Sequence, residues 1–260
     1  MSHVRQSVQI DQEALLVRTL GLKLSNGHVI EGHEHSWGQL IFASRGVMQV
    51  DADGSRWAVP PMRCLWMPSG IDHETRIIGE TWMRTIYIRP DLAVRLPLKC
   101  KVLNVSPLLR EVILETVRLR MLSQSVTTQT HLAAVLIDQL VAADEMSLKI
   151  TMPADARAVR LANFISGDPA DKSPLNELAK LTGASPRTLE RLFVQETGLS
   201  VGRWRQQARL MMAIQLLVEG SPVNQSAFAS GYESPSSFVA MFRREIGITP
   251  GQYLRDLKSE

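Results

Sequence analysis

Three histidines and one glutamine stand at a spacing that could hold a metal ion. His33 and His35 are separated by one residue, Gln39 follows them, and His73 comes later in the chain. Residues two apart on a strand point to the same side, so a neighbouring strand that carries His73 would bring three imidazoles beside an amide oxygen. Such donors suit Zn, Ni, Cu or Fe(II) and leave one position open for a ligand or water. The alternative is a patch of hydrogen-bonded histidines without a metal.

The elements that must position these side chains are short strands. Runs of apolar and β-branched residues are bounded by turn signals such as Arg45-Gly46, Asp53-Gly54 and Pro60-Pro61. Several short strands at such intervals predict a β-sandwich or β-barrel. The expected strands are 39–43, 47–51, 56–59, 63–67, 73–78 and 81–88. Four of the five tryptophans fall in this part, where filling a small barrel is their more frequent use and lining a pocket the less frequent one.

The histidine spacing resembles the two cupin motifs. The first motif is matched by Gly27, His33, His35, Gln39 and Gly46, and the second by Pro68, Gly70 and His73. Three positions depart from the pattern: Gln39 stands where the metal-binding cupins have Glu, Met62 replaces the Gly that opens the second motif, and Ile77 replaces its final Asn. The resemblance implies a cupin-like barrel, with a divalent metal held by His33, His35, His73 and Gln39.

A cupin-like barrel could also belong to a metal-dependent dioxygenase or isomerase with an attached helical domain. Such chemistry needs an acid or a base beside the metal. The carboxylate of the motif is replaced by Gln39, and Glu34 and Glu74 alternate to the other face of a strand. We therefore expect a binding protein and not an enzyme. In a further alternative, the barrel only dimerises and binds no ligand.

Two amphipathic helices are expected after the barrel. The first is capped by Ser106-Pro107 and carries apolar residues up to Leu119, and the second carries them from Leu132 to Ala143. Their apolar faces must be buried against the barrel or against a second copy of the chain, and both alternatives stay open. The polar run 149–155 is expected to be a linker, and 155–165 the first helix of the next domain.

The C-terminal part contains one pattern twice. Ala179-x3-Gly183 followed by Ser185-Pro186 recurs as Ala227-x3-Gly231 followed by Ser234-Pro235. The glycine ends one helix, and Ser-Pro supplies the N-cap and first residue of the next, so each copy predicts a helix-turn-helix. The helix expected between the copies, about 19 residues and roughly 28 Å long, approaches the roughly 34 Å between successive major-groove faces of B-DNA. One chain could therefore read two adjacent grooves.

The second helix of each copy has an apolar stripe for the core and an opposite stripe for a DNA groove. The residues expected at the DNA are Ser185, Arg187, Thr188, Glu190 and Arg191 in the first copy, and Ser236, Ser237, Ala240 and Arg243 in the second. Arginine can bind a guanine bidentately, and glutamate can accept from a cytosine amino group. The small residues of the second copy favour positioning and shape readout. The basic cluster around the first copy comprises Lys180, Arg187, Arg191, Arg203, Arg205 and Arg209.

These residues resemble the DNA-binding domain of AraC/XylS-type transcriptional regulators. The match consists of Gly198-Leu-Ser, Trp204, Arg209-Leu210, Ala213, Leu216-Leu217, Ala227, Gly231-Tyr232, Ser234, Phe238, Phe242-Arg243, Gly247, Thr249-Pro250 and Tyr253. The resemblance implies a regulator that activates or represses promoters in response to an effector sensed by the barrel. It also implies double-stranded promoter DNA, a small-molecule effector, RNA polymerase and a second copy of the chain as partners.

Length and composition fit a two-domain α+β protein. We expect a cupin-like barrel over 1–98, a helical segment with linker over 99–150, and an all-α domain with tandem helix-turn-helix motifs over 151–260. The net charge of +3 gives only weak support for nucleic-acid binding. No apolar run is long enough to span a membrane, and the stretch around His3 to Asp11 lacks a signal-peptide core, so a cytoplasmic protein is expected. Cys64 and Cys100 fit no metal-binding spacing and are expected to be reduced thiols.

Overall fold

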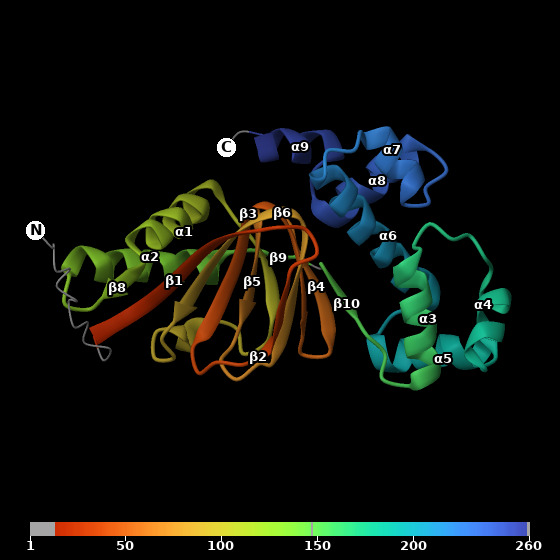
Figure 1. Ribbon diagram of the computed structural model, residues 1–260, viewed down its shortest axis with the longest axis horizontal. Helices are drawn as coiled ribbons and strands as arrows, with labels where there is room; N and C mark the ends of the chain where they lie inside the picture. Colours follow the sequence, from red (N-terminus) through yellow and green to blue (C-terminus); the bar gives the residue numbers. More distant parts are fainter. Residues whose placement is uncertain (1–13, 147, 259–260) are drawn as a thin grey trace, which may run out of the picture.

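A computed structural model describes residues 14–146 and 148–258, which form a β-rich domain followed by a helical domain (Figure 1). The stretch around His3 to Asp11, discussed above for its lack of a signal-peptide core, lies outside the described residues. In the described part of the chain, no helix is long and apolar enough to cross a membrane.

One ten-stranded sheet, curled into a barrel, makes up the β-rich domain. Its strands are β1 (Leu15–Leu24), β2 (Val29–His33), β3 (Gly38–Ala52), β4 (Ser55–Val59), β5 (Arg63–Met67), β6 (His73–Ile88), β7 (Lys101–Asn104), β8 (Met121–Ser123), β9 (Glu145–Met146) and β10 (Lys149–Thr151). The order along the sheet is β8-β1-β6-β3-β5-β7-β9, with β2 on β6 and β4 between β3 and β10. A short 3-10 helix, Ala93–Arg95, lies between β6 and β7.

Two long strands, β3 and β6, form the spine of the barrel. The sequence predicts each as two strands, yet they run unbroken past Gly46 and Gly79. The register of the β3–β6 pair shifts on both sides of Arg45, which marks bulges, and a bulge bends a strand without ending it. At the bend Gly46 has φ +81°, and a Cβ there would lie 2.1 Å from Thr81 Oγ1. Only glycine allows β3 to turn so closely against β6.

The helices α1 (Pro107–Leu119) and α2 (Thr127–Ala142) follow the main strands. The Ser106 hydroxyl accepts from the backbone N–H of Leu109, which is the N-cap that the sequence predicts. Both helices bury one side against the sheet, in a cluster that includes Leu40, Phe42 and Trp66. They therefore cover the barrel, one of the two uses expected for them.

Seven helices make up the described part of the C-terminal domain. They are α3 (Ala156–Gly167), α4 (Leu175–Thr182), α5 (Pro186–Thr197), α6 (Val201–Val218), α7 (Val223–Ala229), α8 (Pro235–Ile246) and α9 (Pro250–Lys258). The pairs α4–α5 and α7–α8 are the two helix-turn-helices. The hydroxyls of Ser185 and Ser234 accept from the backbone N–H groups of Thr188 and Ser237, so both predicted N-caps are present. The helix α6 separates the two units (Figure 1).

The junction between the domains is more ordered than a linker. The first three residues of the predicted linker form β10, which pairs antiparallel with β4 and so belongs to the sheet. The Ile150 side chain is nevertheless buried in the core of the first helix-turn-helix, and Trp204 Nε1 donates to the Thr151 carbonyl at 2.9 Å. The barrel sheet also extends beyond residue 98 through β7 to β10. Short polar strands at a sheet edge carry too few residues for their period to be read from sequence.

A second connection is apolar. One cluster of buried side chains runs from the barrel, including Met48 and Met83, past Leu217 of α6 into the second helix-turn-helix, including Phe238 and Phe242. The two domains therefore share a continuous core instead of meeting only at a strand.

Candidate functional site

The first recognition helix, α5, presents its predicted groove side to solvent. Leu189, Leu192 and Phe193 are buried in the core of the unit, whereas Arg187 and Arg191 are exposed. Arg191 Nη1 donates to Gln195 Oε1 at 2.8 Å, one turn further along the helix. Because this partner is neutral, the guanidinium keeps its full charge and can still meet a base edge or a phosphate.

Three other predicted contact residues are engaged within the protein. The Ser185 hydroxyl lies 2.9 Å from that of Thr188 and caps the helix, so both hydroxyls serve its N-terminus. Glu190 Oε2 accepts from the backbone N–H of Val201 at 3.1 Å. Its carboxylate therefore faces the first turn of α6, where negative charge also stabilises the helix. This geometry gives Glu190 a capping role, which competes with the cytosine contact that the sequence suggests.

The second recognition helix, α8, offers small side chains and later positive charges. Phe238, Met241 and Phe242 are buried. The predicted contact residues Ser236, Ser237, Ala240 and Arg243 are all exposed. Ser237 Oγ donates to the Ser234 carbonyl at 2.8 Å, so one of the two serines is already occupied at the helix start. The exposed surface of α8 is therefore flatter and less charged at its N-terminus than that of α5.

Not every arginine of the predicted basic cluster is available to DNA. The terminal nitrogens Nη1 and Nη2 of Arg205 both donate to the Ser173 carbonyl at 3.1 Å. Arg209 donates to the carbonyls of Pro169 and Asp171 at 2.8 and 3.2 Å. These two side chains tie the loop between α3 and α4 to the middle of α6. Spacing alone could not distinguish them from groove residues, because the loop they hold is remote in sequence.

The separation of the two units follows from α6. Its 18 residues correspond to about 27 Å at 1.5 Å per residue, near the roughly 34 Å repeat of the major groove. The N-terminal end of α6 contacts α5, and its C-terminal half packs with α7 and α9. The helix thus acts as the spacer between the recognition helices.

The histidine cluster forms where β2 ends and β6 begins. His33 and His73 are paired across the two strands, with ring centroids 4.4 Å apart. His35 lies beyond the end of β2, and its ring is 5.2 Å from that of His73. The candidate ligand nitrogens all lie within 4.8 Å of one another. The expected convergence of the three side chains is therefore present, although His35 reaches it from a loop and not from the strand.

Backbone carbonyls determine which nitrogen of each ring is protonated. The Nδ1 atoms of His33, His35 and His73 lie 2.8, 2.6 and 2.9 Å from the carbonyl oxygens of Glu31, Trp37 and Ile71. A carbonyl can only accept, so each Nδ1 must donate. In a neutral ring Nε2 then carries a lone pair, which is the form that binds metals, with the backbone as the outer partner.

Gln39 completes the cluster from β3. It is buried, its Nε2 donates to Thr85 Oγ1 at 2.8 Å, and its Oε1 lies 2.8 Å from His35 Nε2. With a neutral His35 ring, two lone pairs would face each other there unless one metal ion binds both atoms. With the amide turned over, its NH₂ group would instead donate to His35 Nε2, and no cation would be required. These two arrangements correspond to the metal site and the hydrogen-bonded patch expected from the sequence.

The donor set fits a divalent metal. Two imidazole nitrogens on one tetrahedral ion are about 3.4 Å apart, so side-chain rotations must close the observed spread of up to 4.8 Å. Burial lowers the pKa of His73, and the neighbouring His33 and His35 lower it further. The buried member of the cluster is therefore held in the neutral form that a metal needs. The exposed His28 and His131 lie outside the cluster.

Comparisons with known proteins give matches for both domains. Residues 23–150 match the model of the AraC-like ligand binding domain, and residues 178–256 match a helix-turn-helix domain model. The HTH-type transcriptional regulator NimR of Escherichia coli K12 is 35% identical over 226 residues, which cover 86% of this chain and 82% of that protein. The virulence regulon transcriptional activator VirF of Yersinia enterocolitica is 25% identical over 251 residues, or 94% of this chain and 90% of that protein.

Among solved structures, a DNA-binding transcriptional dual regulator from Escherichia coli K-12 is 27% identical. The match spans 40% of this chain and 99% of that structure, with a TM-score of 0.37. The sequence relatives are named as regulators, and the barrel itself matches the model of a ligand-binding domain. The chain belongs to the AraC family of transcriptional regulators, with an AraC-like ligand-binding domain followed by a helix-turn-helix DNA-binding domain.

Proposed function

We propose that this chain controls promoters in response to an effector that its barrel senses through a metal-centred histidine cluster. The observation that carries the proposal is the pairing of two free recognition surfaces with a converged set of three histidines. The histidines and Gln39 would hold a divalent ion of the Zn, Ni, Cu or Fe(II) class and leave a coordination position for a small molecule. The protein would work in the cytoplasm.

DNA recognition would be divided between the two units. Arg187 and Arg191 would read bases from α5, whereas α8 would position the protein through phosphates and groove shape. The first step is to recover operator fragments from genomic DNA with the purified chain. Arg191→Ala should then cost about 1–3 kcal/mol on the operator and less on random DNA. Arg205→Lys is a useful comparison, because Arg205 holds a loop and should affect both DNAs equally. If Arg191→Ala lost the same affinity for the operator and for random DNA, Arg191 would contact only phosphate.

The metal is tested by its content in the purified protein. About one ion per chain is expected, and His35→Ala should remove it. The operator affinity of this metal-free variant then shows what the ion contributes to DNA binding. His131→Ala changes an exposed histidine outside the cluster and should retain the ion. Gln39→Glu restores the carboxylate of the cupin motif and should tighten metal binding, since an anionic ligand replaces a neutral one. A metal-free chain with an undiminished effector response would leave the histidines as a hydrogen-bonded patch.

The remaining partners are a second copy of the chain and RNA polymerase. The apolar side chains Leu108 of α1 and Val135 and Val141 of α2 are 55%, 40% and 44% exposed, which supports self-association through this side of the barrel. Val135→Glu should shift the chain to a monomer in sedimentation equilibrium if α2 forms the interface. An unchanged mass would place the interface elsewhere. Contact with RNA polymerase would accompany activation and is tested by transcription from the recovered operator.

A further inference from the structure

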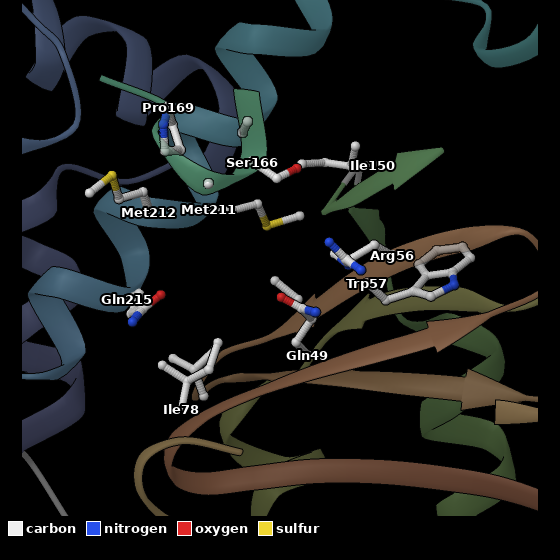
Figure 2. A pocket seen from close by; sticks show the side chains of 14 residues that line it. Gln49, Arg56, Trp57, Ile78, Ile150, Ser166, Pro169, Met211, Met212 and Gln215 are labelled. Atoms are coloured by element: carbon white, nitrogen blue, oxygen red, sulfur yellow. The ribbon is translucent and has the colours of Figure 1, made fainter. Parts of the chain in front are cut away.

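A cavity separates the outer face of the barrel from the DNA-binding domain. Its volume is about 250 Å³, at the small end of ligand pockets, which suits a molecule with a single ring. The floor comes from β3, β4 and β6 and the roof from α6 and the end of α3 (Figure 2). None of the clustered histidines lines it, so it is distinct from the proposed metal site.

The polar groups of the cavity point to the chemistry of an occupant. The Gln49 amide reaches this space and has no hydrogen-bond partner within residues 14–146 and 148–258. Arg56 Nε and Nη2 donate to the carboxylate of Asp51 at 2.8 and 3.0 Å, which leaves Nη1 for another acceptor. Because Asp51 balances the charge of Arg56, the walls suit a neutral acceptor better than an anion.

The other walls are apolar and adaptable. Met211 of α6 and Ile78 of β6 face the space, whereas the Trp57 ring points away from it into the barrel (Figure 2). Methionine fits irregular apolar shapes, so the roof can adjust to a ring. A flat molecule could therefore lie between Met211 and the sheet while a carbonyl or amide group meets Gln49 and Arg56.

We propose that this cavity is a second effector site, which takes a small, neutral, ring-containing amide or carbonyl compound. The inference rests on the proposed regulatory function. Since both domains supply its walls, an occupant favours the arrangement in which they are apposed and thereby changes how α5 and α8 meet DNA.

Benzamide is a suitable probe, because it combines one ring with one neutral amide. In protein labelled with ¹³C at the methionine methyls, millimolar benzamide should shift the Met211 and Met212 resonances saturably. Met121, at the far side of the barrel on β8, should not move. Toluene lacks the amide and benzoate carries a charge, so both should bind at least about fivefold more weakly.

Two variants locate the binding site. Ser166→Leu places a larger side chain at the cavity wall and should weaken benzamide at least about tenfold, whereas Ser166→Ala should not. Gln49→Leu keeps the size of the side chain and should weaken it about five- to tenfold. His35→Ala should leave the shifts intact. The proposal is overturned by absent shifts, by shifts that survive Ser166→Leu in a folded variant, or by shifts lost in His35→Ala.

The coupling is measured on the operator that the protein itself selects. Saturating benzamide should change the operator affinity of the unaltered protein about fivefold or more. The operator affinity of Ser166→Leu should not change. Binding without any change in operator affinity overturns the effector role. Failure to select an operator contradicts the proposed regulatory function, while the methyl shifts still decide whether the cavity binds.

Discussion

The two helix-turn-helices provide a matched pair of glycines that separates backbone strain from packing. Gly183 and Gly231 occupy corresponding places in the repeat and have φ +70° and +85°, where an L side chain is strained. A Cβ on Gly183 would meet nothing within 4 Å. On Gly231 it would lie 2.9 Å from Ala170 Cα and 3.0 Å from Arg209 Nε. Arg209 cannot easily move aside, because it is hydrogen-bonded to the Pro169 carbonyl.

The magnitudes follow from these distances. Gly183→Ala should cost about 1–2 kcal/mol of unfolding free energy, the cost of a left-handed residue. Gly231→Ala carries the same strain plus about 1–3 kcal/mol of overpacking against a backbone atom, about 2–5 kcal/mol in all. Because the second change pushes the α7–α8 unit away from the α3–α4 loop, it should also weaken operator binding under conditions where both variants are folded.

Urea unfolding of the full chain, followed by far-UV circular dichroism, measures the difference directly. The two variants change the same residue type in equivalent turns, so their effects on the unfolded chain should cancel. Equal losses of stability would contradict the close contact between the second turn and the α3–α4 loop. A larger loss of stability for Gly183→Ala than for Gly231→Ala would contradict the absence of neighbouring atoms, among the described residues, around the Gly183 turn.

Three further outcomes are expected. Glu190→Gln should keep most of the stability, and Glu190→Ala should lose about 1 kcal/mol because the backbone N–H of Val201, at the start of α6, loses its acceptor. Base preference should be unchanged in both variants, and an altered preference would make Glu190 a base reader. Burial raises the pKa of the Cys64 and Cys100 thiols to about 12, above the usual value of 9, so stability should be complete below pH 9 and fall by roughly 1 kcal/mol per pH unit per thiol above it. Replacing both cysteines by Ala should flatten urea midpoints measured from pH 8 to 10. Base changes in the half-site under α8 should alter affinity little, and a consensus as strict as that under α5 would contradict shape readout.

Local signals in the sequence were sufficient for the helical domain. The N-caps Ser185 and Ser234 and the turn glycines Gly183 and Gly231 lie where the repeated pattern predicts them, because capping depends on neighbouring residues. The barrel and its histidine cluster were also predictable, since the motif spacing places His33 and His73 on neighbouring strands.

Contacts between distant segments were not predictable in the same way. Glu190 looks like a base-reading residue until α6 is known to begin beside it, and Arg205 looks like a groove residue until the α3–α4 loop is placed. The cavity above Gln49 needs the orientation of two domains, on which no periodicity bears. Each of these features depends on where a remote backbone group lies in space.

The short strand β10 has a consequence for how this protein can be divided. A C-terminal fragment that begins after Thr151 would lack Ile150 from its core and the carbonyl that accepts from Trp204. A barrel that ends before Lys149 would expose β4 as an unpaired edge, and such edges invite aggregation. Three residues thus complete both halves at once. A domain exchanged with a related chain will therefore fold well only when the donor also supplies the strand that corresponds to β10. The unit that can be recombined is thus larger than either domain.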